Sequence, residues 1–266
     1  IGGTVMNLHL QLILPSLFLP LMLSLALVGW SRGHPRLVWA LPLIWLPCLF
    51  WLVGGPKVAP EEANDWLWPL AIVSAGLGFV LAQRPRASAG VQTGLLALAL
   101  LAMSWPVLRY QPALGLALEL TVVVAGGAVL FFNTPASRAA APALALAVSA
   151  GGLGLVTALD GSLLVGQLAI ALASVTGAFA LFELYKRLSI SALGLAELVP
   201  LVQIYLALLL IARVYAEIPL ASSALLLAAP LLGLLPRSRF AVLGSVASVA
   251  GALAWVLLSA DSSSYY

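Results

Sequence analysis

Residues 140–185 read AAPALALAVSAGGLGLVTALDGSLLVGQLAIALASVTGAFALFELY. The stretch contains two charged residues, Asp160 near its middle and Glu183 near its end. A transmembrane α-helix needs about 20 consecutive, predominantly apolar residues. The stretch therefore predicts two membrane-spanning helices, over 140–158 and 162–185, joined by a tight turn at Asp160.

The rest of the chain has the same character. Of its 266 residues, 63% are hydrophobic and 8% are charged, and the mean hydropathy is +1.12. An ordinary globular domain has about 25% charged residues. The composition excludes a cytosolic enzyme and a disordered protein. It also excludes a nucleic-acid-binding protein, because the basic residues are scattered and form no cluster. We expect a single integral membrane domain over 1–266, with no soluble domain.

The fold class that follows is all-α: a polytopic transmembrane helical bundle of about ten spans. The first apolar run is expected to be a retained span, because no basic residue precedes it and it exceeds the apolar core of a signal peptide, which has about 7–15 residues. Short polar segments separate the predicted spans, which are 8–30, 37–54, 66–83, 91–108, 113–133, 140–158, 162–185, 193–213, 218–235 and 240–259.

Basic residues alternate between the two sides that these spans define. Loops after odd-numbered spans contain nine of the twelve: Arg32, Arg36, Arg84, Arg86, Arg138, Lys186, Arg187, Arg237 and Arg239. Loops after even-numbered spans hold the other three, Lys57, Arg109 and Arg213. Cytoplasmic loops carry the excess of Lys and Arg. The pattern predicts a cell membrane protein, in the plasma or inner membrane, with both termini on the non-cytoplasmic side.

Ten spans also allow a five-plus-five organisation. Because five is odd, a duplicated half would be inverted, as in many secondary transporters. Two pairs of prolines fall in corresponding spans, Pro69 with Pro200 and Pro106 with Pro230. In-span prolines can kink a helix or free carbonyl groups that line a cavity. The many glycines of the later half are expected to pack helices within one chain.

Ionisable residues within a span are expensive and point to function. Glu119 lies six residues from the outer end of the fifth predicted span, roughly 9 Å into the membrane. At that depth it needs a partner or a proton. Gln167 in the seventh span lies at a similar depth. The alternative is a structural one, in which a neutral Glu119 bonds to a neighbouring helix.

A second polar group is expected near the inner face. Glu197, Pro200 and Gln203 lie almost on one side of the eighth span, with Tyr205 nearby and Asn133 at a similar depth in the fifth. We interpret the outer and inner groups as candidates for a substrate or proton path. A set of structural hydrogen bonds would leave the same pattern.

Motifs for catalysis or for a bound cofactor are missing from the sequence. It has neither HExxH nor the P-loop pattern, and it lacks the Asp-rich spacings of intramembrane prenyl transfer. The single cysteine, Cys48, excludes an internal disulfide, and two histidines do not build a haem or metal site. We predict that the chain is not an enzyme and has no metal and no cofactor.

The later part of the chain contains Phe182-Glu183-Leu184-Tyr185, Ser189-Ile190-Ser191 and Glu197-Leu198-Val199-Pro200, followed by the acid Glu217. In these residues the segment from Phe179 to Pro236, about a fifth of the chain, loosely resembles the last helices of drug/metabolite-type transporters of the EamA kind. The resemblance implies transport. The predicted outer termini oppose that family's usual orientation.

Two functions remain open. The first is a transporter or permease for a small molecule, in which Glu119 or Glu197 carries a coupling proton. The second is a non-catalytic membrane subunit that stabilises a larger complex, with Glu61, Glu62 and Asp65 as an acidic docking face. The expected partners are the lipid bilayer and either other membrane subunits or a second copy of this chain, and no nucleic acid.

Overall fold

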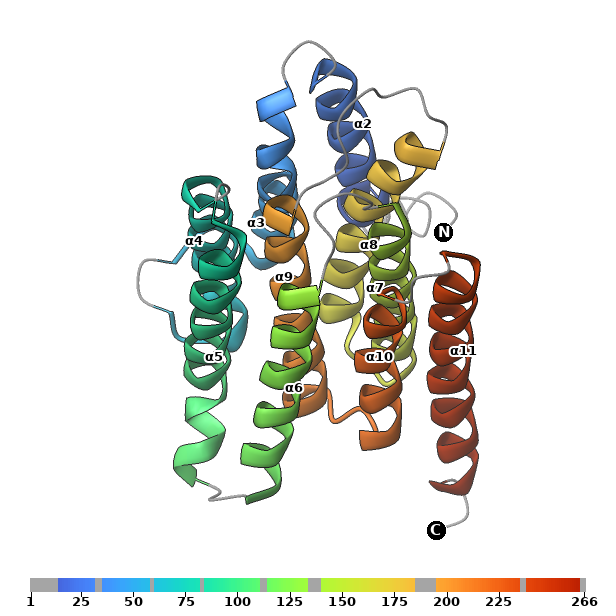
Figure 1. The fold of residues 1–266 in the computed structure, drawn as a ribbon. Coiled ribbons are helices and arrows are strands. Elements are labelled where there is room, and N and C mark those ends of the chain that lie inside the picture. The colour runs from blue at the N-terminus through green and yellow to red at the C-terminus, as the bar shows by residue number, and fades with distance from the viewer. Residues whose placement is uncertain are drawn as a thin grey trace, which may run out of the picture.

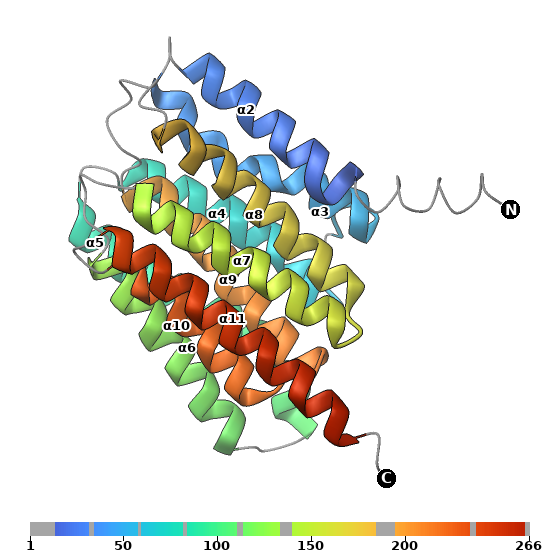
Figure 2. The same cartoon turned by 90° about the vertical axis from the view of Figure 1, so that its right-hand side faces the viewer.

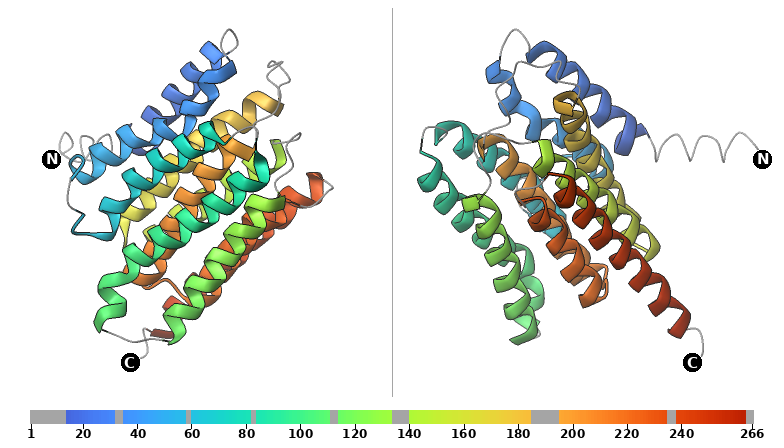
Figure 3. Two further views of the ribbon diagram at one scale, coloured as in Figure 1. Left: turned by 60° about the vertical axis from the view of Figure 1, so that its left-hand side comes forward. Right: turned by 45° about the vertical axis from the view of Figure 1, so that its right-hand side comes forward.

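The computed structural model describes residues 14–31, 35–57, 60–81, 84–110, 114–133, 140–184, 195–234 and 238–263, and every regular element within these ranges is a helix. The helices lie side by side, and successive helices from α4 to α11 run in alternating directions (Figure 1; Figure 2). The C-terminal ends of α5, α7, α9 and α11 gather at one end, with the N-terminal ends of α6, α8 and α10 (Figure 3). We call this the Asp160 end. The prediction of an all-α bundle is confirmed.

Six of the described helices are long and apolar enough to cross a membrane. They are α5 (Pro85–Tyr110), α6 (Leu114–Asn133), α7 (Ala140–Leu159), α8 (Leu163–Leu184), α9 (Leu195–Tyr215) and α11 (Ser238–Ser263). They indicate a membrane-embedded protein.

The remaining elements are shorter: η1 (Leu14–Phe18, a π-helix), α2 (Leu19–Ser31), η2 (Pro35–Ile44, a 3₁₀-helix), α3 (Trp45–Val53), η3 (Ala63–Trp66, 3₁₀), α4 (Leu67–Val80) and α10 (Leu220–Leu232). A helix as short as α10, with 13 residues, is about 20 Å long, whereas the hydrocarbon core is about 30 Å thick. The prediction of about ten spans is therefore not confirmed. Prolines contribute to the shortness: Pro42 lies in η2, and α10 begins after Pro219.

The proposed inverted repeat finds no support in the helix packing. In such a repeat α7 would correspond to α2. However, α7 packs against α8, α9, α10 and α11, whereas α2 packs mainly against η1, η2, α3 and α8. Pro69 and Pro200 also differ, because Pro69 lies in the first turn of α4 and Pro200 lies inside α9.

Helix α9 is the core of the bundle. It contacts α4, α5, α6, α7, α8, α10 and η2, and it lies in the middle of Figure 1. Of its membrane-length segment, Leu198–Tyr215, 83% is buried, against 33% for the corresponding segments of α5, α6 and α11. The side chains of α9 therefore face neighbouring helices on all sides.

Glycines bring α7 close to two neighbours. Gly154 of α7 and Gly166 of α8 meet where these helices cross, and a Cβ on either would lie 3.0 Å from the other's carbonyl oxygen. A Cβ on Gly152 would lie 2.4 Å from the Val249 side chain of α11. The prediction that these glycines pack helices within one chain is confirmed.

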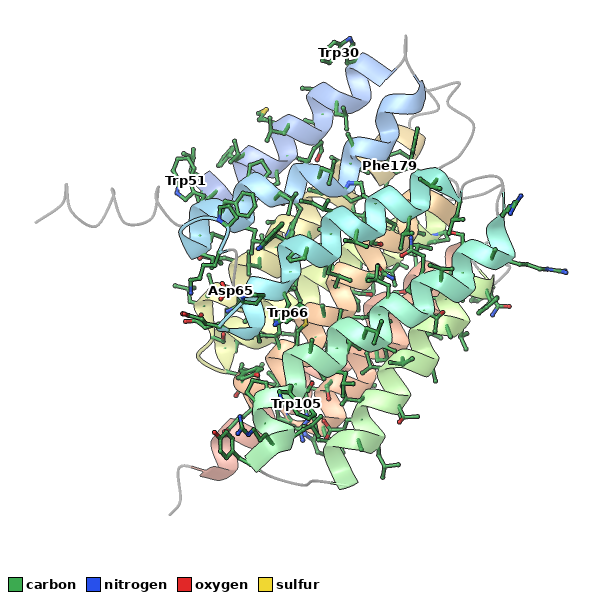
Figure 4. The ribbon with its side chains drawn as sticks, turned by 90° about the vertical axis from the view of Figure 1, so that its left-hand side faces the viewer. Trp30, Trp51, Asp65, Trp66, Trp105 and Phe179 are labelled. Carbon is green, nitrogen blue, oxygen red and sulfur yellow. The ribbon has the colours of Figure 1, made fainter. Side chains whose placement is uncertain are left out.

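The outer faces of the bundle are apolar. Trp30 and Trp51 are 70% and 61% exposed and project away from the helices (Figure 4). Trp105, near the end of α5, is 59% exposed. Large apolar side chains on the outer surface are suited to contact with lipid, because lipid tails are as apolar as these side chains.

The prolines of the described helices fall into two classes. Pro20, Pro47 and Pro69 lie just after η1, η2 and η3 pass directly into α2, α3 and α4, where the type of helix changes, and Pro142 lies in the first turn of α7. Pro42, Pro106, Pro200 and Pro230 lie inside helices. Each of these prolines leaves a carbonyl group in the preceding turn without its intrahelical donor.

Tyr205 compensates for one of these prolines. Pro230 has no N–H to donate to the carbonyl oxygen of Leu226, four residues earlier in α10. The Tyr205 hydroxyl of α9 donates to this oxygen at 2.7 Å, and Tyr205 is fully buried. The phenol therefore satisfies an acceptor that α10 itself leaves open.

Replacing Tyr205 with Phe should lower stability by about 1–3 kcal/mol, because the buried Leu226 carbonyl then has no donor. Thermal unfolding in mild detergent measures this loss. In a Pro230→Ala background, the new N–H restores a donor, so Tyr205→Phe should cost clearly less. Equal costs in both backgrounds would contradict this account. Tyr110→Phe, at a residue that is 78% exposed, is the control and should change little.

Candidate functional site

An ion pair joins α6 to α9 close to the Asp160 end. Arg213 Nη2 lies 3.0 Å from Glu119 Oε1, and the two side chains are 30% and 22% exposed, respectively. The partner that the depth of Glu119 requires is therefore Arg213. A partly buried pair is screened less by water and salt than a fully exposed one.

The chain reversal after α9 holds the arginine in place. Arg213 lies in the last turn of α9, and its Nη1 donates to the carbonyl oxygen of Ile218 at 3.1 Å. Glu217 between them has a φ of 57°, which is uncommon for a residue other than glycine. This left-handed residue ends the helix, and the N–H groups of Ala216 and Ile218 both donate to Ala212 O.

One nitrogen of the Arg213 guanidinium has no hydrogen-bond acceptor among the described residues. This nitrogen is Nε, and it is buried. A buried donor without a partner is costly. The unused donor therefore marks Arg213 as a group that can take a further acceptor.

A cavity of about 330 Å³ adjoins the pair, between α6, α9 and α10. Its polar side chains are those of Glu119, Arg213 and Ser223. The other lining residues are apolar or glycine: Gly115, Leu118, Val122, Val123, Leu209, Leu210, Leu220, Ala224 and Leu227.

The cavity opens sideways and narrows within the bundle. Leu118, Val122 and Leu220 of its lining are between 57% and 59% exposed, so its mouth faces outward between α6 and α10. Further along α6, a Cβ on Gly126 would lie 3.2 Å from Leu227 Cδ1 of α10. The two helices therefore close on each other there. A second cavity, of about 420 Å³ between α5 and α6, has Thr121 as its polar lining residue and no charged group.

A separate polar network crosses the core between α4, α5 and α9. The Ser74 hydroxyl donates to Gln92 Oε1 at 3.0 Å, and Gln92 Nε2 donates to the Ser74 carbonyl at 2.9 Å. Gln203 Nε2 donates to the Gln92 carbonyl at 2.7 Å. All three side chains are fully buried. Gln203 Oε1 has no hydrogen-bond partner among the described residues.

The residues predicted to form the outer and inner polar groups do not come together as expected. Gln167 is buried in α8 and does not line the Glu119 cavity, because α8 packs on the opposite side of α9 and α7 from α6 (Figure 1). Asn133 is exposed and bonds within its own helix, to Val129 O. Pro200 is buried inside α9. The side chain of Glu197 lies outside the described ones.

Sequence reasoning missed Arg213, Gln92 and Ser74 as site residues. Arg213 was expected to be a loop charge, yet it lies within α9. The usable signal was its place on the same predicted side as Glu119 within a span, since two opposite charges on one side of a membrane are candidates for pairing. Gln92 lies shortly after Arg84 and Arg86, and nothing in the sequence around it indicates a buried polar contact.

The expected acidic docking face is partly wrong. Asp65 is 2% exposed, and its Oδ2 accepts hydrogen bonds from the backbone N–H groups of Glu61 and Glu62, each at 3.0 Å. Lys57 Nζ lies 3.4 Å from the same oxygen. Asp65 therefore ties down the connection before α4 (Figure 4), which leaves Glu61 and Glu62 at the surface.

The comparisons add no assignment. Among the described residues, no group of three or more His, Cys, Asp or Glu could hold a metal ion. No protein-family model, no curated protein and no solved structure matches the chain. The resemblance of Phe179–Pro236 to EamA-type transporters accordingly gains no support.

The bonds to Asp65 predict how stability depends on pH. Burial by itself raises the pKa of Asp65, but the N–H donors of Glu62 and Glu61 and the charge of Lys57 outweigh it, and the pKa lies below the ordinary 3.8. The stabilisation is complete above about pH 3.9, the unfolded value, and is lost as the pH falls through the lowered folded pKa. Asp65→Asn should therefore lower the melting temperature at pH 7, and this difference from wild type should shrink below about pH 4.

Glu61→Gln is the matched control, because the Glu61 side chain is 79% exposed. Its effect on the melting temperature should be small at both pH values. If Asp65→Asn is as neutral as Glu61→Gln at pH 7, Asp65 does not anchor this connection.

Proposed function

We propose that this chain is a multi-pass membrane transporter, a permease for a small molecule, and that the cavity between α6, α9 and α10 takes up the substrate. The observation that carries the proposal is the Glu119–Arg213 pair in the wall of an otherwise apolar cavity. Charged residues inside a membrane bundle are expensive, and they mark substrate and ion pathways.

The pair also suggests how a proton is coupled. A ligand that competes for Arg213 frees Glu119 in an apolar wall, where taking up a proton removes an unpaired charge. Of the charged side chains near Glu119, Arg213 lines the cavity, whereas Glu217 and Arg109 lie at the same end of the bundle outside the lining. Glu119 is therefore our first candidate for the coupling proton, and Glu197 remains the second.

Alternating access would then require a movement of α6 relative to α10 at the narrow part of the cavity. The contact between Gly126 and Leu227 closes the cavity toward the opposite end of the bundle. Substrate passage requires α6 and α10 to part there and to approach each other at the Asp160 end. α10 suits such a motion because it is short and is bounded by Pro219 and the turn at Gly233.

We further propose that the shorter helices complete about ten membrane crossings. A 3₁₀-helix rises about 2.0 Å per residue, so η2 spans about 20 Å, and α3 adds about 14 Å at about 1.5 Å per residue. Together they reach across a hydrocarbon core of about 30 Å. The alternation of basic residues supports a location in the plasma or inner membrane with the Asp160 end on the non-cytoplasmic side.

Extraction from native membranes in mild detergent, followed by mass determination and identification of all co-purifying proteins, tests the function. We expect a particle accounted for by one chain of 27.6 kDa or by two copies. A stoichiometric set of other membrane proteins would instead assign the chain as a non-catalytic subunit of a larger complex.

Cysteine labelling tests the crossings. Cys48 is buried, so a single new cysteine dominates the signal. Glu61→Cys and Asp160→Cys should react with a membrane-impermeant maleimide added to intact cells. Ala87→Cys, at an exposed residue beyond α4, should react only after permeabilisation. Reaction of Glu61→Cys and Ala87→Cys from the same side would show that α4 does not cross the membrane.

A further inference from the structure

We infer that the cavity binds a single-chain amphiphile with an oxyanion headgroup, a carboxylate or a phosphate, which enters sideways from the bilayer. The inference names the substrate class of the proposed transporter and rests on that function where transport is concerned. Four features lead to it: the donors of Arg213, the sign of the local field, the shape of the cavity, and the depth of Arg213.

Arg213 has hydrogen-bonding capacity to spare. Nη1 is bonded to Ile218 O and Nη2 to Glu119, whereas the buried Nε has no acceptor among the described residues. Nε and Nη2 form one edge of the planar guanidinium, the arrangement that binds two oxygens of a carboxylate or phosphate. A cationic or purely apolar headgroup would leave Nε unsatisfied.

The local field favours an anion. Helices α6 and α10 both begin at the cavity, since Gly115 lies in the first turn of α6 and Leu220 and Ser223 lie in the first turn of α10. Each N-terminus carries about half a positive charge, and the C-terminus of α9 carries about half a negative one. With Glu119 and Arg213 cancelling each other, the groups that line the cavity sum to a positive charge, and the nearby Glu217 is exposed outside the lining and therefore more strongly screened.

The shape fits an acyl chain. Apolar side chains of α6, α9 and α10 form the walls, and the exposed Leu118 and Val122 lie at an open side. The volume of about 330 Å³ is at the lower end of the range for small-molecule pockets. A longer chain would leave through the mouth into the surrounding lipid.

The depth of Arg213 in the bundle suits a lipid-like ligand, whose headgroup lies toward the membrane surface. Arg213 is two residues from the end of α9 at Tyr215, about 3 Å along the helix. A headgroup that takes the place of the Glu119 carboxylate on Arg213 therefore lies toward the Asp160 end, within about 9 Å of the membrane surface, and its chain extends along the wall toward Leu227. In binding, a singly charged oxyanion replaces the Glu119 carboxylate on Nη2 and accepts from Nε, and Glu119 takes up one proton from the solvent, so the net charge of the site is unchanged.

Titration calorimetry on the full chain in phosphatidylcholine nanodiscs tests the inference, with empty nanodiscs as the blank. The ligands are decyl phosphate, decanoate, inorganic phosphate and decyltrimethylammonium. We expect saturable binding of decyl phosphate and decanoate, and none of the other two at the same concentrations. Equal binding of inorganic phosphate, or saturable binding of decyltrimethylammonium, would overturn the inference.

Four variants locate the site. Arg213→Gln should weaken decyl phosphate binding by about tenfold or more, the loss expected for hydrogen bonds to a charged group. Glu119→Gln should strengthen binding, because no carboxylate then competes for Arg213. Val122→Trp should weaken binding by filling the mouth while leaving both charges in place. Glu217→Gln, at an exposed residue outside the lining, is the control and should bind like wild type.

The direction of the Glu119→Gln effect is decisive, and Val122→Trp keeps the test valid if Arg213→Gln does not fold. Unchanged affinity in both Arg213→Gln and Val122→Trp, or weaker binding in Glu119→Gln, would overturn the inference. Flux of decyl phosphate into proteoliposomes is measured separately. Binding that follows the expected pattern without flux would refute the transporter and leave the ligand class standing.

Discussion

The structure depends on how α9 satisfies its polar groups inside an apolar bundle. Gln203 and Tyr205 are fully buried and Arg213 is partly buried, so their donors and acceptors need partners on neighbouring helices. Gln203 bonds to α5, Tyr205 to α10, and Arg213 to α6, and Tyr215 bonds to Met103 O of α5. One helix thereby fixes the positions of three others through directional bonds, which dispersion contacts between leucines alone would not do.

Some buried polar atoms of α9 have a hydrogen-bond partner and others do not. Tyr205 donates to the Leu226 carbonyl oxygen, which has lost its helical donor because residue 230 is proline. The proline in α10 therefore leaves no unsatisfied acceptor at this position. By contrast, Nε of Arg213 and Oε1 of Gln203 are buried without partners among the described residues. Buried groups of this kind are rare in native proteins and call for an explanation. At Arg213, the adjoining cavity provides one.

The sequence was sufficient for the general architecture and insufficient for the site. Apolar runs such as 140–158 and 162–185 predicted α7 and α8 closely, because an apolar segment bounded by a charged turn has few alternatives in a membrane. Prolines were harder to interpret, since Pro69 lies in the first turn of α4 and Pro230 lies inside α10. Glu119 was identified from its depth alone. Its partner was not, because pairing across helices depends on which helices are neighbours, and no periodicity within a helix contains that information.

The sideways mouth at Leu118, Val122 and Leu220 has a consequence for selectivity. A ligand that arrives through the bilayer is first concentrated there by partitioning, at about 0.8 kcal/mol for each buried CH₂ group. The lipid phase, and not the protein, then sets most of the preference for chain length. For the ligands proposed above, the contacts at Arg213 would then need only to discriminate between headgroups. Two ligands with equal affinity for the cavity would thus differ in apparent potency by their partition coefficients, and the same chain would rank its ligands differently in membranes of different composition.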